Sequence, residues 1–273
     1  MRTHTDGNSI VFDGVNDLNL ALTFDCGQAF RWSRNTDGSW HAAVKDRSVD
    51  VIQQGNTITV RGDTDSWFWI KYLDLECDYG AICRRLKTDK WLNTAITEYG
   101  GIRILRQDPW EALCSFIISQ NNNIPRIKGI ISRLCENFGD RIGGTNLFSF
   151  PSAEKISSLT EDDLAVIRSG FRAKYILAGA NAALEDGFLE SMYYLPIDEA
   201  RKKIKTVKGI GPKVADCALL YGFHRTECFP VDVWMKKAMG KLLPDVDPSI
   251  FGTDAGIAQQ YIFHYSRMHP ELF

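Results

Sequence analysis

A glycine turn that runs directly into a helix is the feature that most constrains this chain. Residues 207–217 read Val-Lys-Gly-Ile-Gly-Pro-Lys-Val-Ala-Asp-Cys. Gly209 and Gly211 permit a tight turn and close backbone approach, and Pro212 suits the first position of a helix. With the helix predicted at 196–206, this makes a helix–hairpin–helix. The unpaired N–H groups at the second helix start form an anion site that fits a DNA phosphate, although an ordinary connection between helices has the same pattern.

Two residues near the turn in the sequence have side chains suited to covalent catalysis. Lys213 stands in the first turn of the second helix, and Asp232 follows 19 positions later, before an apolar run of helical spacing. A lysine amine attacks carbonyl-like carbons, including C1′ of a sugar, and a carboxylate can take up the proton. The alternative is a surface lysine and an aspartate that only caps its helix, although capping does not exclude catalysis.

The distribution of charge is more informative than its total. The formal net charge is −2, and residues 1–100 carry 11 Lys and Arg against 14 Asp and Glu. Residues 201–241 carry ten basic residues against three acidic ones. That local excess can attract a polyanion to a protein that is acidic overall, although a solvated helix face has a similar composition.

Composition excludes several classes of protein. The sequence contains no 18-residue apolar run and no basic-then-apolar leader after Met1, so we expect no membrane span and no signal peptide. The seven cysteines are scattered, without a CxxC pair or the spacing of a zinc or iron–sulfur site. We therefore expect an intracellular protein in a reducing compartment.

The pattern along the chain predicts an α+β fold. An N-terminal antiparallel twisted β-sheet domain with flanking helices is expected at 1–105, and an all-helical catalytic core at 106–273. Asp37-Gly38 and Gly55-Asn56 are predicted hairpin turns, and helical spacing begins around Trp67. The predicted strands are 9–12, 18–23, 29–33, 40–44, 48–52 and 57–60. The predicted helices of the core are 110–119, 124–138, 153–158, 161–169, 172–186, 196–206, 212–221, 233–242 and 254–267.

Together with further motifs, the turn resembles the helix–hairpin–helix DNA glycosylase superfamily, specifically the 8-oxoguanine DNA glycosylases of the Ogg type. The resemblance extends over nearly the whole chain, and its segments occur in the family's order. They are Gly-Gln-Ala-Phe-Arg-Trp at 27–32, Gln-Asp-Pro at 107–109, Ser-Gln-Asn-Asn-Asn-Ile-Pro-Arg at 119–126, Gly-Phe-Arg-Ala-Lys-Tyr at 170–175 and Ala-Gly-Ile-Ala-Gln-Gln-Tyr-Ile-Phe at 255–263.

The resemblance implies roles at the reacting nucleotide. Lys213 would be the nucleophile and Asp232 the second catalytic residue. The backbone carbonyl of Gly27 would accept the N7–H that 8-oxoguanine has and guanine lacks. Three further residues would contact the flipped base: Cys217 and Phe263 would sandwich it, and Gln259 would read its Watson–Crick edge.

The resemblance also implies contacts with the rest of the DNA. Asn121, Arg126 and Arg172 would fill the gap that the flipped base leaves in the duplex. They would also hold the cytosine that was paired with it. Phe171, where a tyrosine is common, would wedge the duplex. The remaining DNA-binding residues would be Gly209, Gly211 and Val214 at the hairpin, and Trp234, which stands where some relatives have a phosphate-contacting histidine.

The implied partner is double-stranded DNA containing 8-oxoguanine, bound by a monomer. The resemblance implies no required cofactor and no iron–sulfur cluster. Backbone carbonyls of Lys205, Val207 and Ile210 would offer a site in the hairpin to a structural monovalent or divalent cation.

The expected activity is a bifunctional one. The chain would remove 8-oxoguanine, preferentially opposite cytosine, through a lysine Schiff base and then cleave the strand by β-elimination. One alternative is a monofunctional alkyl-base glycosylase that relies on Asp232 and water. Another is a catalytically silent DNA-binding module. The third is an enzyme of oxidised pyrimidines similar to endonuclease III, whose four C-terminal cysteines have no counterpart after Cys228.

Overall fold

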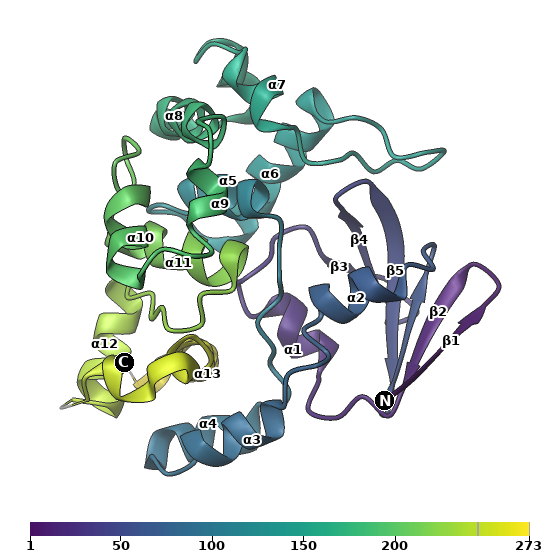
Figure 1. The fold of residues 1–273 in the computed structure, drawn as a ribbon, viewed down its shortest axis with the longest axis vertical. Helices are drawn as coiled ribbons and strands as arrows, with labels where there is room; N and C mark the ends of the chain where they lie inside the picture. Colours follow the sequence, from purple (N-terminus) through teal and green to yellow (C-terminus); the bar gives the residue numbers. More distant parts are fainter. Residues whose placement is uncertain (245, 273) are drawn as a thin grey trace.

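The N-terminal part of the chain forms one antiparallel sheet, drawn on one side of the molecule in Figure 1. The computed structural model describes residues 1–244 and 246–272. Within these residues the strand order is β1-β2-β6-β5-β4-β3. Phe12, Val51 and Val60 are buried and their chain neighbours less so, as in a sheet with one covered face. The strands are β1 Arg2–Asp6, β2 Ser9–Asp13, β3 Ser33–Arg34, β4 Trp40–Val44, β5 Arg47–Gln54 and β6 Thr57–Arg61.

The predicted strand at 18–23 is wrong. The segment alternates like a strand, but Asn19 accepts a hydrogen bond from the Leu22 amide at 3.1 Å and caps helix α1, Leu20–Asp25. The predicted strand at 29–33 reaches the sheet only at its last residue. The polar edge strand β1 was not predicted, because all five of its residues are exposed. Both predicted hairpin turns are confirmed, between β3 and β4 and between β5 and β6.

The rest of the chain is helical, which confirms the α+β class. Most predicted helices of the core occur with ends shifted by up to three residues, while 161–169 contains only a short 3₁₀ helix, Asp163–Ile167. The helices are α2 Ser66–Tyr72, α3 Tyr79–Leu86, α4 Lys90–Glu98, α5 Pro109–Ile118, α6 Ile124–Phe138, α7 Ala153–Ser157, α8 Ala173–Ala183, α9 Phe188–Ser191, α10 Ile197–Ile204, α11 Pro212–Phe223, α12 Val233–Leu242 and α13 Ala255–Met268.

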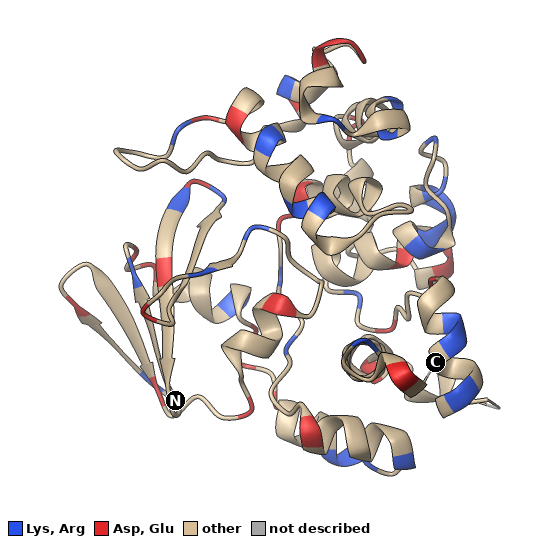
Figure 2. Cartoon of the chain, turned by 180° about the vertical axis from the view of Figure 1, so that it is seen from behind, with Lys and Arg blue, Asp and Glu red and all other residues tan. Residues whose placement is uncertain are grey.

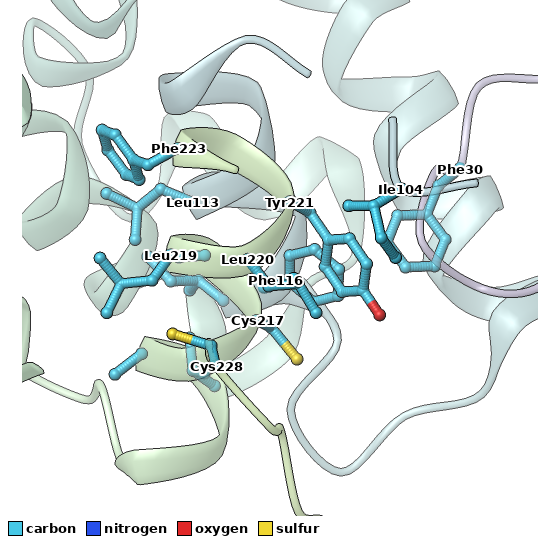
Figure 3. Close-up of a cluster of buried hydrophobic side chains, with 14 of the residues drawn as sticks. Phe30, Ile104, Leu113, Phe116, Cys217, Leu219, Leu220, Tyr221, Phe223 and Cys228 are labelled. Carbon is cyan, nitrogen blue, oxygen red and sulfur yellow. The ribbon is translucent and has the colours of Figure 1, made fainter. Parts of the chain in front are cut away.

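Two hydrophobic cores hold these elements. One lies between the sheet, α1 and α2, and extends to Leu105. The other joins α5, α6, α8, α10, α11 and α13, and Figure 3 shows part of it around α11. Helices α3 and α4 belong to this second core, because α4 packs along α13. The division into domains at 105/106 stays a prediction, and Phe273, its last residue, lies outside the described residues.

Among the described residues, none of the helices has the length and apolar character required to cross a membrane.

Candidate active site

The glycine turn joins α10 to α11 as predicted. Gly209 has a φ of 89°, in the left-handed region, and a methyl group there would overlap the Tyr175 ring. Ile210 is buried beneath the turn and anchors it. Gly211 caps α11 without a side-chain hydrogen bond, so the first N–H groups of α11 have no partner from a cap. The hairpin therefore leaves these N–H groups available to an anion, and its binding of a DNA phosphate stays a prediction.

Replacing Gly209 by alanine is expected to destabilise the hairpin. The left-handed backbone and the overlap with the Tyr175 ring together cost about 2 to 5 kcal/mol of unfolding free energy. Gly211→Ala is the matched control, because Gly211 has φ −93° and no neighbour within 4 Å of an added Cβ. Thermal unfolding of the two variants measures the difference. Equal unfolding temperatures would show that the turn does not need the glycine conformation.

Lys213 and Asp232 are held by the elements that carry them. The Lys213 amine donates to the Ser119 hydroxyl at 3.1 Å and lies 5.4 Å from the centre of the Phe116 ring. Ser119 in turn donates to the Phe116 carbonyl, so its oxygen is free to accept from the lysine. The Asp232 carboxylate accepts from the Met235 amide at 2.7 Å and caps α12, as expected. Each group is thereby fixed in orientation without being neutralised by an ion pair in the described residues.

Two cavities meet at this pair. The outer cleft has a volume of about 710 Å³ and runs between the hairpin side of α11, the 119–122 loop and α12. The inner pocket has a volume of about 490 Å³ and leads towards Gly27 and α13. Lys213 and Asp232 line both, together with Ser119, Asn122 and Trp234. A group entering the inner pocket from the outer cleft therefore passes the amine and the carboxylate.

Gly27 and Phe263 both line the inner pocket and lie next to each other. Gly27 has a φ of 87°, and a Cβ built on it would lie 3.4 Å from both Phe263 Cε1 and Ile124 Cδ1. A side chain at this position would therefore fill the space between the turn and α13. The structure brings these two predicted residues together with Lys213 and Asp232.

Cys217 and Gln259 lie outside the residues that line the inner pocket. Both are 4% exposed, and Figure 3 shows Cys217 on α11 within the hydrophobic cluster. Burial raises the pKa of the Cys217 thiol to about 11, against the opposing effect of the Lys213 charge, so the thiol is neutral near pH 7. The Gln259 side-chain oxygen has no hydrogen-bond partner among the described residues. Their predicted contacts with a base stay predictions.

Of three further predicted DNA-binding residues, only Phe171 lines the outer cleft. Phe171 is 52% exposed and Arg126 is exposed, whereas Arg172 is only 2% exposed. Arg172 donates to the carbonyls of Gln120, Asn121 and Ser169, using four of its five hydrogens and leaving one on Nη1. Burial lowers the Arg172 pKa, and the nearby Arg126 charge acts in the same direction. Arg172 thus shapes the loop that presents Asn121, whose φ is 46°.

Several residues at the site were not assigned by the sequence. Lys236 and Lys237 line the outer cleft, and both are exposed and without an ion pair in the described residues. Figure 2 shows basic residues on the side of the molecule that carries α10 and α12. The local basic excess was the available signal for them. Trp234, by contrast, is a predicted DNA-binding residue; it lines both cavities, and its indole N–H donates to the Ser266 hydroxyl at 2.8 Å.

Comparisons with known proteins agree with this arrangement. Residues 10–113 match the 8-oxoguanine DNA glycosylase N-terminal domain, and residues 114–245 match the HhH-GPD superfamily of base excision DNA repair proteins. An N-glycosylase/DNA lyase of Saccharomyces cerevisiae is 41% identical over 81% of this chain and 67% of its own length. The chain belongs to the 8-oxoguanine DNA glycosylase family. A relative from Arabidopsis thaliana, named N-glycosylase/DNA lyase OGG1, is 31% identical over 84% of the chain and 68% of its own.

Solved structures of this glycosylase family share the whole fold. MBOgg1 in complex with a low-affinity DNA ligand is 38% identical, with a TM-score of 0.94 over 98% of this chain and 99% of its own. The 8-oxoguanine glycosylase/lyase of Clostridium acetobutylicum, with double-stranded DNA containing cytosine opposite 8-oxoG, is 36% identical, with a TM-score of 0.90 over 99% of both chains. The predicted family is therefore confirmed, together with its bifunctional glycosylase and lyase class.

The hairpin carbonyls are compatible with the cation expected in this glycosylase family. The carbonyls of Lys205 and Ile210 accept no hydrogen bond from the described residues outside regular helix pairing, and the Val207 carbonyl accepts one from the Ile210 amide at 3.1 Å. Each has a lone pair to offer a hard cation. No group of three or more His, Cys, Asp or Glu side chains that could hold a metal occurs among the described residues. The cation stays a prediction.

Proposed function

We propose that this chain excises 8-oxoguanine from duplex DNA through a covalent bond to Lys213 and then cleaves the strand. The observation that carries the proposal is the position of Lys213 and Asp232 where the outer cleft opens into the inner pocket. The duplex backbone follows the outer cleft, and the damaged base enters the inner pocket. Extruding the base costs a few kcal/mol of stacking and pairing, which contacts with the hairpin amides and basic residues offset.

The chemistry proceeds in two steps. The lone pair of the Lys213 amine attacks C1′, the bond from C1′ to N9 breaks, and the base leaves with the electron pair. Asp232 stabilises the positive charge that develops on the sugar and takes up the proton released by the amine. Opening of the sugar ring then gives a Schiff base between Lys213 and C1′. Loss of a C2′ proton from this Schiff base expels the 3′ phosphate and cleaves the strand.

Recognition of the damaged base depends on one hydrogen. 8-Oxoguanine carries a hydrogen on N7, whereas guanine has a lone pair there. The carbonyl of Gly27, a residue that lines the inner pocket, accepts this hydrogen. Guanine would leave the carbonyl without a partner and facing a lone pair, at a cost of about 1 to 3 kcal/mol. Phe263 and Cys217 sandwich the base, and Gln259 contacts its Watson–Crick edge.

The proposal is tested with four duplexes, containing 8-oxoguanine, an alkylated purine, an oxidised pyrimidine or no lesion. We expect base release and strand cleavage on the 8-oxoguanine duplex, and a covalent complex when borohydride is added. Release of the alkylated base without a covalent complex would instead indicate a monofunctional enzyme. Binding to all four duplexes without release would indicate a DNA-binding module.

Cytosine opposite the lesion is expected to give the fastest excision. Arg126 and the remaining Nη1 hydrogen of Arg172 offer donors beside the exposed Asn121, and cytosine presents two acceptors, O2 and N3. Adenine presents only one acceptor on its Watson–Crick edge. Single-turnover rates are expected to be about tenfold or more higher opposite cytosine, the effect of roughly one hydrogen bond to a charged group. Equal rates opposite cytosine and adenine would refute this assignment.

Removing the charges of Lys236 and Lys237 is expected to weaken binding to every duplex alike. Each lysine that contacts a phosphate contributes about 0.9 to the slope of log affinity against log salt, so the double glutamine variant should lose up to about 1.8. Lys87→Gln is the matched control, because Lys87 is exposed and does not line the outer cleft. Fluorescence anisotropy at several salt concentrations measures the slopes. An unchanged slope would place both lysines outside the DNA contact.

A further inference from the structure

The backbone carbonyls on either side of Gly27 each accept a hydrogen bond from a side chain. The Asp25 carbonyl accepts a hydrogen bond from Arg267 Nη2 at 2.7 Å, and the Cys26 carbonyl accepts one from Gln260 Nε2 at 3.0 Å. The carbonyl of residue 28 accepts one from Gln107 Nε2 at 2.7 Å. Within residues 1–244 and 246–272, no group donates to the Gly27 carbonyl. Among carbonyls 25–28, it is the one that accepts no hydrogen bond from the described residues, so it is available to a ligand.

The buried side chain of residue 28 holds the turn from the other side. Gln28 Nε2 donates to the carbonyls of Thr23 and Arg103 at 2.9 and 2.7 Å, and its oxygen accepts from the Leu105 amide at 2.8 Å. These contacts join the turn to the segment between the sheet and the helical core. They fix where the turn lies, whereas the contacts from α13 fix the carbonyls directly before Gly27.

Gln260 and Arg267 come from the helix that also carries Phe263. Arg267 follows Phe263 by one helical turn and lines the inner pocket with it. Gln260 is 1% exposed, and its oxygen accepts from the Tyr221 hydroxyl at 2.6 Å, which orients its amide towards the turn. The same helix thus positions the stacking ring and the backbone that faces it.

We propose that Gln260 and Arg267 are positioning residues that hold the Gly27 carbonyl in place for recognition of 8-oxoguanine. This inference rests on the function proposed above. By occupying the two preceding carbonyls, they keep the peptide at Gly27 from rotating and leave its carbonyl aimed at N7 of the flipped base. A carbonyl that could turn towards α13 would lose the N7–H contact, whereas cleavage at an abasic site, which has no base, would not need that contact.

The test compares two reactions of each variant, excision of 8-oxoguanine opposite cytosine and cleavage of a preformed abasic site. Arg267→Met and Gln260→Leu are expected to lower the ratio of the two single-turnover rates by about tenfold, the effect of losing one positioning hydrogen bond. Arg267→Lys retains a donor for the Asp25 carbonyl and is expected to restore most of the ratio. Arg85→Met is the matched control, because Arg85 binds the Asp254 carboxylate at the start of α13 and not the turn, so the ratio should stay within about twofold.

Equal losses in both reactions would overturn the inference, since they would show a structural role only. An equal loss of the ratio in Arg85→Met would overturn it as well. If the buried Gln260→Leu variant does not fold, the partly exposed Arg267 decides the question with its two variants. A wild-type protein that cleaves abasic sites but releases no 8-oxoguanine would contradict the proposed function itself, which is a different result from a changed ratio.

Discussion

Lys213→Gln is expected to abolish base release and strand cleavage while DNA binding is retained. Glutamine keeps a donor that can reach the Ser119 hydroxyl, but it has no nucleophilic amine. The hairpin amides that we propose to bind phosphate belong to the backbone and are unchanged. We expect the single-turnover rate of 8-oxoguanine release to fall by at least about 10³-fold, with a change in duplex affinity of no more than about threefold.

Lys208→Gln provides the control for this result. Lys208 is an exposed lysine of the same hairpin, so its loss removes an equal charge without removing the proposed nucleophile. It should weaken binding slightly and leave the rate of base release at saturating enzyme unchanged. Base release by Lys213→Gln at a rate close to that of Lys208→Gln would show that another group displaces the base.

Asp232→Asn is expected to separate capping from catalysis. Asparagine caps helices about as well as aspartate, so the hydrogen bond from the Met235 amide is retained and the unfolding free energy should change by less than about 0.5 kcal/mol. The negative charge beside the reacting sugar is lost. We expect base release to slow by about 10²-fold or more, which single-turnover kinetics and thermal unfolding of the same preparation measure together.

Asp232→Ala completes this comparison. It removes both the charge and the cap, so it should be as inactive as Asp232→Asn and about 1 kcal/mol less stable. If Asp232→Asn released the base at the wild-type rate, the carboxylate would be a helix cap and nothing more.

Much of the fold was predictable because local signals and tertiary packing agree. Asp108 followed by Pro109 starts α5, and the alternating run at 57–60 lies in β6. The segment 18–23 was mispredicted because its alternation resembles a strand. Its conformation is decided by the Asn19 cap and by burial of Leu20 against the sheet. Helices α3 and α4 follow the sheet in sequence but pack on the helical core. Their position depends on contacts with α13, which is distant in sequence.

The candidate site was predictable where residue type and spacing carry the chemistry. Lys213 and Asp232 follow from a turn, an amine and a carboxylate, and the structure places them at one junction of cavities. The contact between Arg267 and the Asp25 carbonyl joins residues 242 positions apart, and no local pattern indicates it. The hydrogen bonds from Arg172 to loop carbonyls could not be predicted either, because a sequence shows a charged residue but not its partners.

The central claim is that Lys213 forms the covalent bond to the sugar. Its most direct test is borohydride reduction during turnover of an 8-oxoguanine duplex, followed by proteolysis and mass spectrometry of the peptide that carries DNA. The account predicts one modified peptide, with the sugar fragment on the Lys213 amine. Attachment to Lys208 or to the N-terminal amine, or base release with no covalent complex at all, would contradict it.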